Sequence, residues 1–127
     1  MEKVLLVSPD KTSLSNLASA LEKQRDVGVS WATSGSHALE CVSGASFDLV
    51  ITEETLEDMT GLELAGRLLR VNPLIHCASV STLPSEEYHE KSEGLGLMGP
   101  LPDRPGEEDA ERLLQDLRRI KGYLSGG

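Results

Sequence analysis

Residues 48–64, Asp-Leu-Val-Ile-Thr-Glu-Glu-Thr-Leu-Glu-Asp-Met-Thr-Gly-Leu-Glu-Leu, decide the fold of this chain. Their apolar start predicts a short buried strand that ends at the carboxylate of Glu53. An acidic loop follows, and Gly61-Leu62-Glu63-Leu64 opens a helix. Thr60 and Glu63 have capping-box spacing, in which each side chain satisfies a free amide at the helix start. The stretch therefore predicts a strand, a loop and a helix, with a carboxylate where the strand ends.

The same alternation of strand and helix continues along all 127 residues. Apolar or alternating runs predict five strands, at 4–7, 27–31, 47–52, 74–80 and, with a weaker pattern, 94–98. Apolar residues at helical spacing predict five helices between and after them. Thr12 or Ser13 is available to cap the first helix, Leu62, Ala65, Leu68 and Leu69 point inward from the third, and the fourth starts at Ser85. The fold class is thus α/β, a doubly wound five-stranded parallel sheet with five helices in a single domain, residues 1–127.

Composition argues against several classes of function. The net charge of −9 disfavours nucleic-acid binding, which depends on cations, and 3% aromatic residues provide no base-stacking platform. No apolar run approaches the ~20 residues of a membrane span, and the run after Lys3 is too short for a signal peptide. Cys41 and Cys77 are isolated in apolar segments, as expected of buried free thiols in a reducing cytoplasm. A flavodoxin-like cofactor site is disfavoured because no glycine-rich loop follows the first strand.

The candidate site lies where the strands end. Ligands of doubly wound sheets bind in the crevice at the carboxyl ends of the strands. The predicted strands bring five residues to that crevice, namely Ser8, Pro9, Asp10, Glu53 and Ser81.

Along nearly its whole length the chain resembles a receiver domain of bacterial response regulators, the proteins of two-component signalling. Five segments carry the resemblance in register: Lys3-Val4-Leu5-Leu6-Val7, Ala32-Thr33-Ser34-Gly35-Ser36-His37-Ala38-Leu39, Asp48-Leu49-Val50-Ile51, Gly61-Leu62-Glu63-Leu64 and Asn72-Pro73. The resemblance places Glu53 at the phosphoacceptor position and Ser81 at the switch position. It places Thr82 where the family prefers alanine or glycine, so a threonine there narrows the entrance to the site.

The resemblance implies magnesium-dependent phosphorylation of an aspartate, and this sequence departs from that chemistry at three places. Ser8 and Pro9 replace the acidic pair that holds magnesium, an ion that prefers carboxylate oxygens. Glu53 replaces the aspartate, and misplacing a reacting atom by ~1 Å can cost about a hundredfold in rate. Residues 96–102 contain no lysine to pair with a phosphoryl group, although Pro100 or Pro102 could keep the family's cis peptide. These departures predict a pseudo-receiver, a non-enzymatic signalling module without a bound cofactor.

Two alternatives for the acidic residues stay open. Glu53 could imitate phosphoaspartate, with Ser81 hydrogen-bonded to its displaced carboxylate, or it could be a solvated side chain. The chain could also be an atypical magnesium-dependent phosphoacceptor that uses Asp10, Glu53 and Glu54. Asp10 and Glu54 are weak metal candidates, and Asp10 otherwise caps or precedes the first helix. Glu57 and Asp58 are expected to form a solvated loop.

Protein partners follow from the resemblance: a histidine kinase, an effector domain or another regulator. The family uses its fourth helix, fifth strand and fifth helix for output and dimerisation, so a homodimer through the helical part of this face is possible. Residues 85–93 are strongly acidic, and Leu97 stands where the family often has a mobile aromatic. The last helix is either an ordinary amphipathic helix or a docking face for an acidic partner or a second copy, through Arg112, Arg118, Arg119 and Lys121. No nucleic acid or membrane is expected as a partner.

Overall fold

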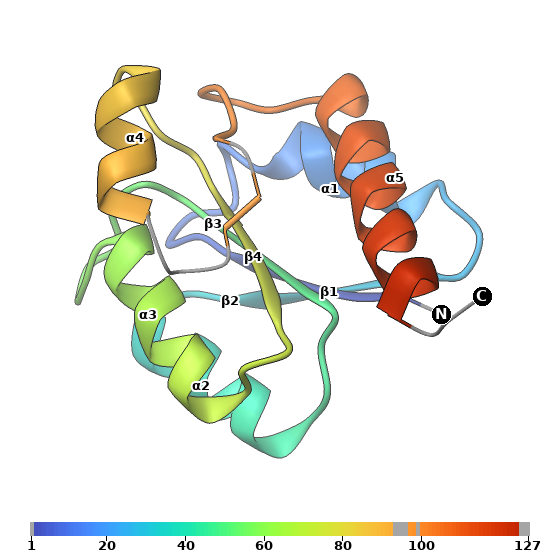
Figure 1. Ribbon diagram of the computed structural model, residues 1–127, viewed down its shortest axis with the longest axis horizontal. Coiled ribbons are helices and arrows are strands. Elements are labelled where there is room, and N and C mark those ends of the chain that lie inside the picture. Colours follow the sequence, from blue (N-terminus) through green and yellow to red (C-terminus); the bar gives the residue numbers. More distant parts are fainter. Residues whose placement is uncertain (1, 93–96, 99, 125–127) are drawn as a thin grey trace.

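The chain folds into alternating strands and helices, seen in a computed structural model that describes residues 2–92, 97–98 and 100–124. In chain order the elements are β1 (Glu2–Val7), α1 (Ser15–Glu22), β2 (Val27–Ala32), α2 (Gly35–Gly44), β3 (Leu49–Thr52), α3 (Gly61–Val71), β4 (His76–Ser79), α4 (Ser85–Ser92) and α5 (Glu107–Leu124). The described strands form a parallel sheet in the order β2-β1-β3-β4 (Figure 1). The predicted α/β class with a parallel sheet is confirmed.

Only part of the predicted fifth strand, residues 94–98, lies among the described residues. Residues 94–96 of the predicted strand lie outside the described residues. Leu97 forms an isolated parallel bridge with Cys77, and Leu101 forms one with Val80, so these two residues lie on the side of β4 away from β3. No peptide bond between described residues is cis, so the bond before Pro102 is trans.

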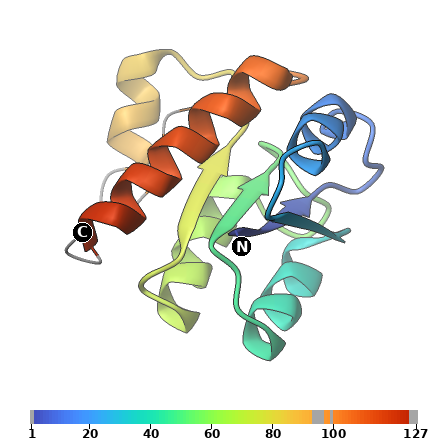
Figure 2. The same cartoon turned by 90° about the vertical axis from the view of Figure 1, so that its right-hand side faces the viewer.

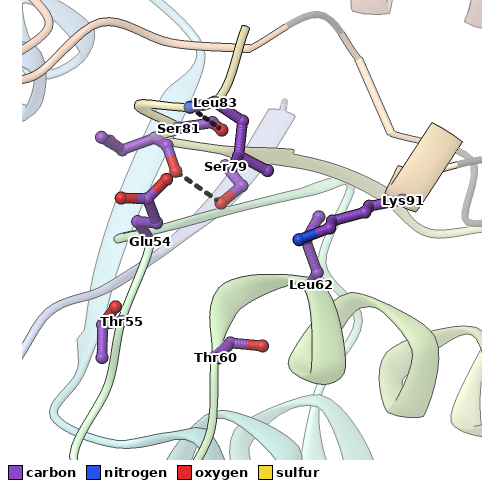
Figure 3. Close-up of a pocket in the computed structure, with 9 residues that line it drawn as sticks. Glu54, Thr55, Thr60, Leu62, Ser79, Ser81, Leu83 and Lys91 are labelled. Carbon is purple, nitrogen blue, oxygen red and sulfur yellow. Dashed lines mark hydrogen bonds between the residues drawn. The ribbon is translucent and has the colours of Figure 1, made fainter. Parts of the chain in front are cut away.

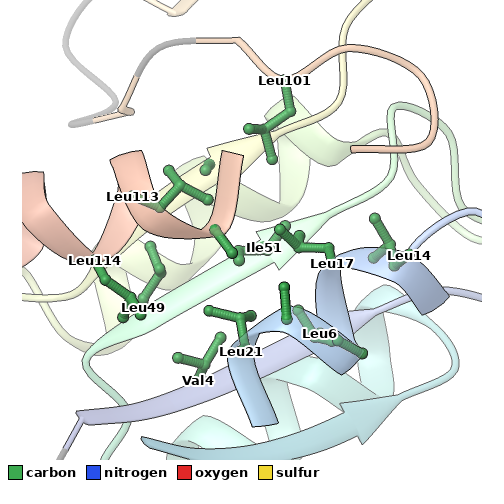
Figure 4. Packing of buried hydrophobic residues seen from close by; sticks show 14 of the residues in the cluster. Val4, Leu6, Leu14, Leu17, Leu21, Leu49, Ile51, Leu101, Leu113 and Leu114 are labelled. Atoms are coloured by element: carbon green, nitrogen blue, oxygen red, sulfur yellow. The ribbon is translucent and has the colours of Figure 1, made fainter. Parts of the chain in front are cut away.

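Helices cover both faces of the sheet, as Figure 2 shows with α1 and α5 on one side and α2 and α3 on the other. Side chains alternate along β1: Val4 and Leu6 enter the cluster under α1 and α5, whereas Leu5 and Val7 enter the cluster over α2 and α3. Figure 4 shows the first of these clusters. The unbroken apolar run of β1 follows from this, since a central parallel strand is buried on both faces.

The ends of α3 agree with the sequence, and its inward face differs in part. The Thr60 side chain accepts a hydrogen bond from the backbone N–H of Glu63 at 3.1 Å, and the helix stops before Pro73. Its buried residues are Gly61, Leu64, Ala65 and Leu68, whereas Leu62 and Leu69 are only half-buried. The inward placement of those two leucines was wrong, because the buried stripe is centred on Leu64 and Leu68.

Three arginines in the described part of the last helix form ion pairs. Arg118 donates to Glu2 at 2.7 Å and so joins α5 to β1, and this hydrogen bond raises the pKa of Arg118. Arg112 pairs with Asp109 at 3.1 Å and Arg119 with Asp116 at 3.4 Å. Each of these arginines thus already has an acidic partner, which favours the ordinary amphipathic helix over a basic docking face.

Two further predictions concern the cysteines and membranes. Cys77 is buried and Cys41 half-buried, and both are free thiols. Burial raises the pKa of Cys77 to about 12, so its thiol stays protonated at neutral pH. Within the described ranges, no helix has both the length and the apolar character that a membrane span requires.

Candidate functional site

The predicted crevice forms at the carboxyl ends of β1 and β3. The parallel register pairs Val7 with Thr52, so the residues that follow, Ser8 and Glu53, emerge side by side. The backbone N–H of Glu53 donates to the carbonyl of Val7 at 3.2 Å, which extends the pairing one residue beyond the strands. Ser8 is fully buried and Glu53 half-buried.

The Glu53 carboxylate is held by two serine hydroxyls. Ser8 donates to one carboxylate oxygen and Ser13, from the loop before α1, donates to the other. We call Ser8, Ser13 and Glu53 the serine–glutamate cluster. The prediction that Thr12 or Ser13 caps α1 was wrong: the N-cap residue is Leu14, which makes no side-chain cap, and the Ser13 hydroxyl is used by Glu53.

Ser81 and Thr82 bind partners other than Glu53. The Ser81 hydroxyl oxygen accepts a hydrogen bond from the backbone N–H of Leu83 at 3.1 Å. Thr82 donates to the Glu54 carboxylate, from its backbone N–H at 2.7 Å and from its hydroxyl at 2.9 Å. The described contacts of Glu53 are with Ser8 and Ser13, so they do not include the hydrogen bond from Ser81 that phosphoaspartate imitation would use.

Asp10 is a turn residue that precedes α1. Its carboxylate accepts from the backbone N–H of Thr12 at 3.0 Å, and one of its oxygens lies 3.5 Å from the Ser8 hydroxyl. Ser8 in turn accepts from the N–H of Lys11, whose φ of 68° marks a tight left-handed turn. Pro9 is exposed in the same turn. This arrangement agrees with the prediction that Asp10 precedes the first helix, rather than with a role as a metal ligand.

The residues present do not fit the magnesium site that the fold implies. Magnesium needs hard oxygen ligands that it can reach directly, chiefly carboxylates. Here Ser8 and Pro9 supply no carboxylate, and both Glu53 oxygens already accept hydroxyl hydrogens. Asp10 binds Thr12 and Glu54 binds Thr82, so the proposed acidic set is engaged at separate places. In the described part of the chain, no group of three acidic, histidine or cysteine side chains is arranged to hold a metal.

Asp58 has a structural role that its sequence position did not indicate. Its carboxylate accepts three hydrogen bonds at 2.9 Å, from the N–H of Gly35 and from both the N–H and the hydroxyl of Ser36. The amide of Ser36 first, and that of Gly35 second, lower the pKa of Asp58. The expectation that Asp58 is a solvated loop residue was thus incomplete: the side chain is exposed, but it caps the free amides at the start of α2.

A pocket of about 290 Å³ opens next to this crevice, between α3, α4 and the end of β4 (Figure 3). We call it the α3–α4 pocket, and its lining residues are Glu54, Thr55, Thr60, Leu62, Ser79, Val80, Ser81, Leu83 and Lys91. Gly61 lies between two of the lining residues, Thr60 and Leu62, and packs closely against the strand ends: a Cβ there would lie 2.5 Å from the Glu53 carbonyl oxygen and 2.7 Å from the Ser79 hydroxyl. Sequence reasoning did not predict this pocket, since its residues come from four separate segments.

Tyr88 anchors α4 to the rest of the domain. It is 2% exposed, and its hydroxyl donates to the carbonyl of Met98 at 3.2 Å. Burial and the neighbouring Cys77 raise the pKa of Tyr88 to about 12. Tyr88 is thus a buried aromatic residue of α4, whereas the position at which the family often has an aromatic is occupied by Leu97.

Comparison with known proteins agrees with this geometry. Residues 4–115 match the family model of the response regulator receiver domain. The chemotaxis response regulator CheY4 of Vibrio cholerae is 24% identical with a TM-score of 0.78, over 92% of this chain and 98% of that one. A CheY-like receiver domain protein from Methanospirillum hungatei is 21% identical with a TM-score of 0.83, over 97% and 98%. The Saccharomyces cerevisiae Ssk1 receiver domain, crystallised with the histidine phosphotransfer protein Ypd1, is 15% identical with a TM-score of 0.80, over 94% and 90%. No curated protein matches the chain.

Proposed function

Because the chain belongs to the response regulator receiver domain family of two-component signalling, we propose that it is a receiver that signals through protein contacts without aspartyl phosphorylation. Glu53 stands at the acceptor position, Ser8 and Pro9 at the acidic pair, and Ser81 and Thr82 at the switch. In this proposal those positions keep the receiver scaffold, while phosphoryl transfer is lost.

The serine–glutamate cluster is the observation that carries the proposal. A phosphoacceptor needs a carboxylate oxygen free to attack the phosphorus in line, beside a metal that neutralises the developing charge. Both Glu53 oxygens instead accept hydroxyl hydrogens, from Ser8 and Ser13. Each hydroxyl stabilises the carboxylate oxygen that would have to attack, and neither hydroxyl supplies a negative charge to attract a cation.

The same contacts tie the turn after β1 to the end of the sheet. Ser8 and Ser13 lie on either side of the turn after β1, and Glu53 follows β3, so the cluster fixes that turn against the sheet. Such a domain offers a partner one fixed surface. The candidate partners are a histidine kinase, an effector domain or another regulator, and the Ssk1 receiver, which is bound to a histidine phosphotransfer protein, supports this class. A homodimer through α4 and α5 remains a second candidate assembly, and the charge of −9 disfavours nucleic acid.

Intact-mass spectrometry after incubation with magnesium and acetyl phosphate tests the proposal. We expect the mass to stay unchanged, while a receiver domain with an acceptor aspartate gains one phosphoryl group in parallel. A Glu53→Gln variant is the matched control, because it keeps the size of the side chain and removes the acidic oxygen. A stoichiometric adduct on the wild type that is absent from Glu53→Gln would overturn the proposal and establish the atypical phosphoacceptor.

A further inference from the structure

The α3–α4 pocket is distinct from the serine–glutamate cluster and has the dimensions of a small-ligand site. None of Ser8, Ser13 and Glu53 lines it. Its volume of about 290 Å³ is close to the lower end of the range of ligand pockets, about 300–1,000 Å³. Its occupant would therefore be a small molecule.

One part of the lining is apolar and the rest offers hydroxyl groups. Leu62 on α3, Val80 after β4 and Leu83 before α4 provide the apolar surface. The hydroxyl oxygens of Thr60 and Ser81 accept backbone N–H groups of Glu63 and Leu83, at 3.1 Å each. Since a hydroxyl can also donate, both side chains keep a hydrogen that a ligand oxygen could accept.

Two opposite charges line the same pocket without pairing. Figure 3 shows the Lys91 side chain extending from α4 toward Leu62, with its ammonium group directed into the pocket. Among the described residues no ion pair joins Lys91 to any carboxylate. The Glu54 carboxylate is held in place by hydrogen bonds from Thr82. A simple anion would be attracted by Lys91 and repelled by Glu54, and a simple cation would experience the reverse.

A ligand that carries both charges close together complements both residues. We propose that the α3–α4 pocket binds a zwitterionic α-amino acid with an apolar side chain. Its carboxylate pairs with Lys91, its ammonium group with Glu54, and its side chain contacts Leu62, Val80 and Leu83. Thr60 and Ser81 are placed to donate to the carboxylate.

Binding at this place would act on the loop between β4 and α4. Ser81 lines the pocket directly, and Thr82 is tied to Glu54, which also lines it. The loop leads into α4 within three residues of Thr82. An amino acid bound here would contact the segment that leads into α4, without any chemistry at Glu53.

An NMR titration of the 15N-labelled protein with L-leucine tests this site. We expect saturable shifts of the amides of Leu62, Ser81, Thr82 and Lys91 at millimolar leucine. Lys91→Gln should weaken binding about two- to fivefold, the range for one exposed charge pair. Lys23→Gln, which removes an exposed lysine at the end of α1, is the matched control and should leave the affinity unchanged.

Analogues test the two charges separately. Leucinamide lacks the carboxylate and N-acetyl-leucine lacks the ammonium group, so each should bind more weakly than leucine. The proposal is overturned if leucine causes no saturable shifts, if Lys91→Gln binds as tightly as the wild type, or if leucinamide matches leucine. Because no phosphodonor is present, the result does not depend on whether Glu53 can be phosphorylated.

Discussion

Replacing Gly61 with alanine should destabilise the domain, although alanine is the better helix former. Gly61 is the first residue of α3, where the helix begins against the ends of β3 and β4. An added Cβ would lie 2.5 Å from the Glu53 carbonyl oxygen, 2.7 Å from the Ser79 hydroxyl and 3.0 Å from a methyl carbon of Thr52. The nearest of these atoms belongs to the backbone, so it cannot move away by a side-chain rotation.

The expected size of the effect comes from two opposing terms. Forcing an extra carbon into a packed site costs about 1–3 kcal/mol. The change from glycine to alanine returns at most about 1 kcal/mol of helix propensity. We therefore expect the free energy of unfolding to fall by about 1–2 kcal/mol for Gly61→Ala. With a urea m-value of about 1–3 kcal/mol/M, the unfolding midpoint should fall by roughly 0.3–2 M.

Gly44→Ala is the matched control for this measurement. Gly44 is the last residue of α2, and a Cβ there would meet nothing within 4 Å. Only the difference in helix propensity between glycine and alanine then affects stability. The free energy of unfolding of this variant should therefore be unchanged or higher by less than about 1 kcal/mol. Urea denaturation of both variants, followed by circular dichroism, should show a loss of stability for Gly61→Ala and no loss for Gly44→Ala. A Gly61→Ala protein as stable as the wild type would refute the close-approach argument.

Two further changes test contacts that lie away from the pocket. Asp58→Asn should weaken the start of α2 at neutral pH. The folded-state pKa of Asp58 lies below its ordinary value, so its carboxylate adds to the free energy of unfolding above about pH 4. This stabilisation is lost as the pH falls through the lowered pKa. The stability difference between the two proteins should therefore shrink in acid. Tyr88→Phe removes the hydroxyl that donates to Met98 and should lower the free energy of unfolding by about 1 kcal/mol in urea denaturation. A Tyr88→Phe protein of unchanged midpoint, or an Asp58 effect independent of pH, would contradict these assignments.

Most of the fold could be predicted because each element has a local signal. The apolar run of Val4–Val7 requires burial on both faces, and the structure provides it. Thr60 three residues before Glu63 marked the start of α3, and Pro73 its end. The fifth strand had the weakest pattern, and only the bridges of Leu97 and Leu101 now mark its place.

The contacts of the candidate site could be predicted only in part. Strand order brought Ser8 and Glu53 together, because residues after parallel strands meet at one edge. Ser13 lies 40 residues from Glu53, and Asp58 lies 23 residues from Gly35. Single hydroxyl and carboxylate residues in loops have no periodic pattern, so the sequence assigned Ser13 to a local cap and Asp58 to solvent. Only the folded loops determine which distant partner each side chain reaches.

The serine–glutamate cluster also limits how such a site can evolve. Changing Glu53 alone to aspartate would shorten the side chain and withdraw its carboxylate from Ser8 and Ser13, before any metal ligand exists. Changing Ser8 or Pro9 alone to aspartate would place a second negative charge beside Glu53 with no cation to offset it. Every single substitution toward a metal-binding acidic site therefore removes a satisfied contact or adds repulsion. A return to an acidic metal site would therefore need several substitutions together to avoid a less stable intermediate.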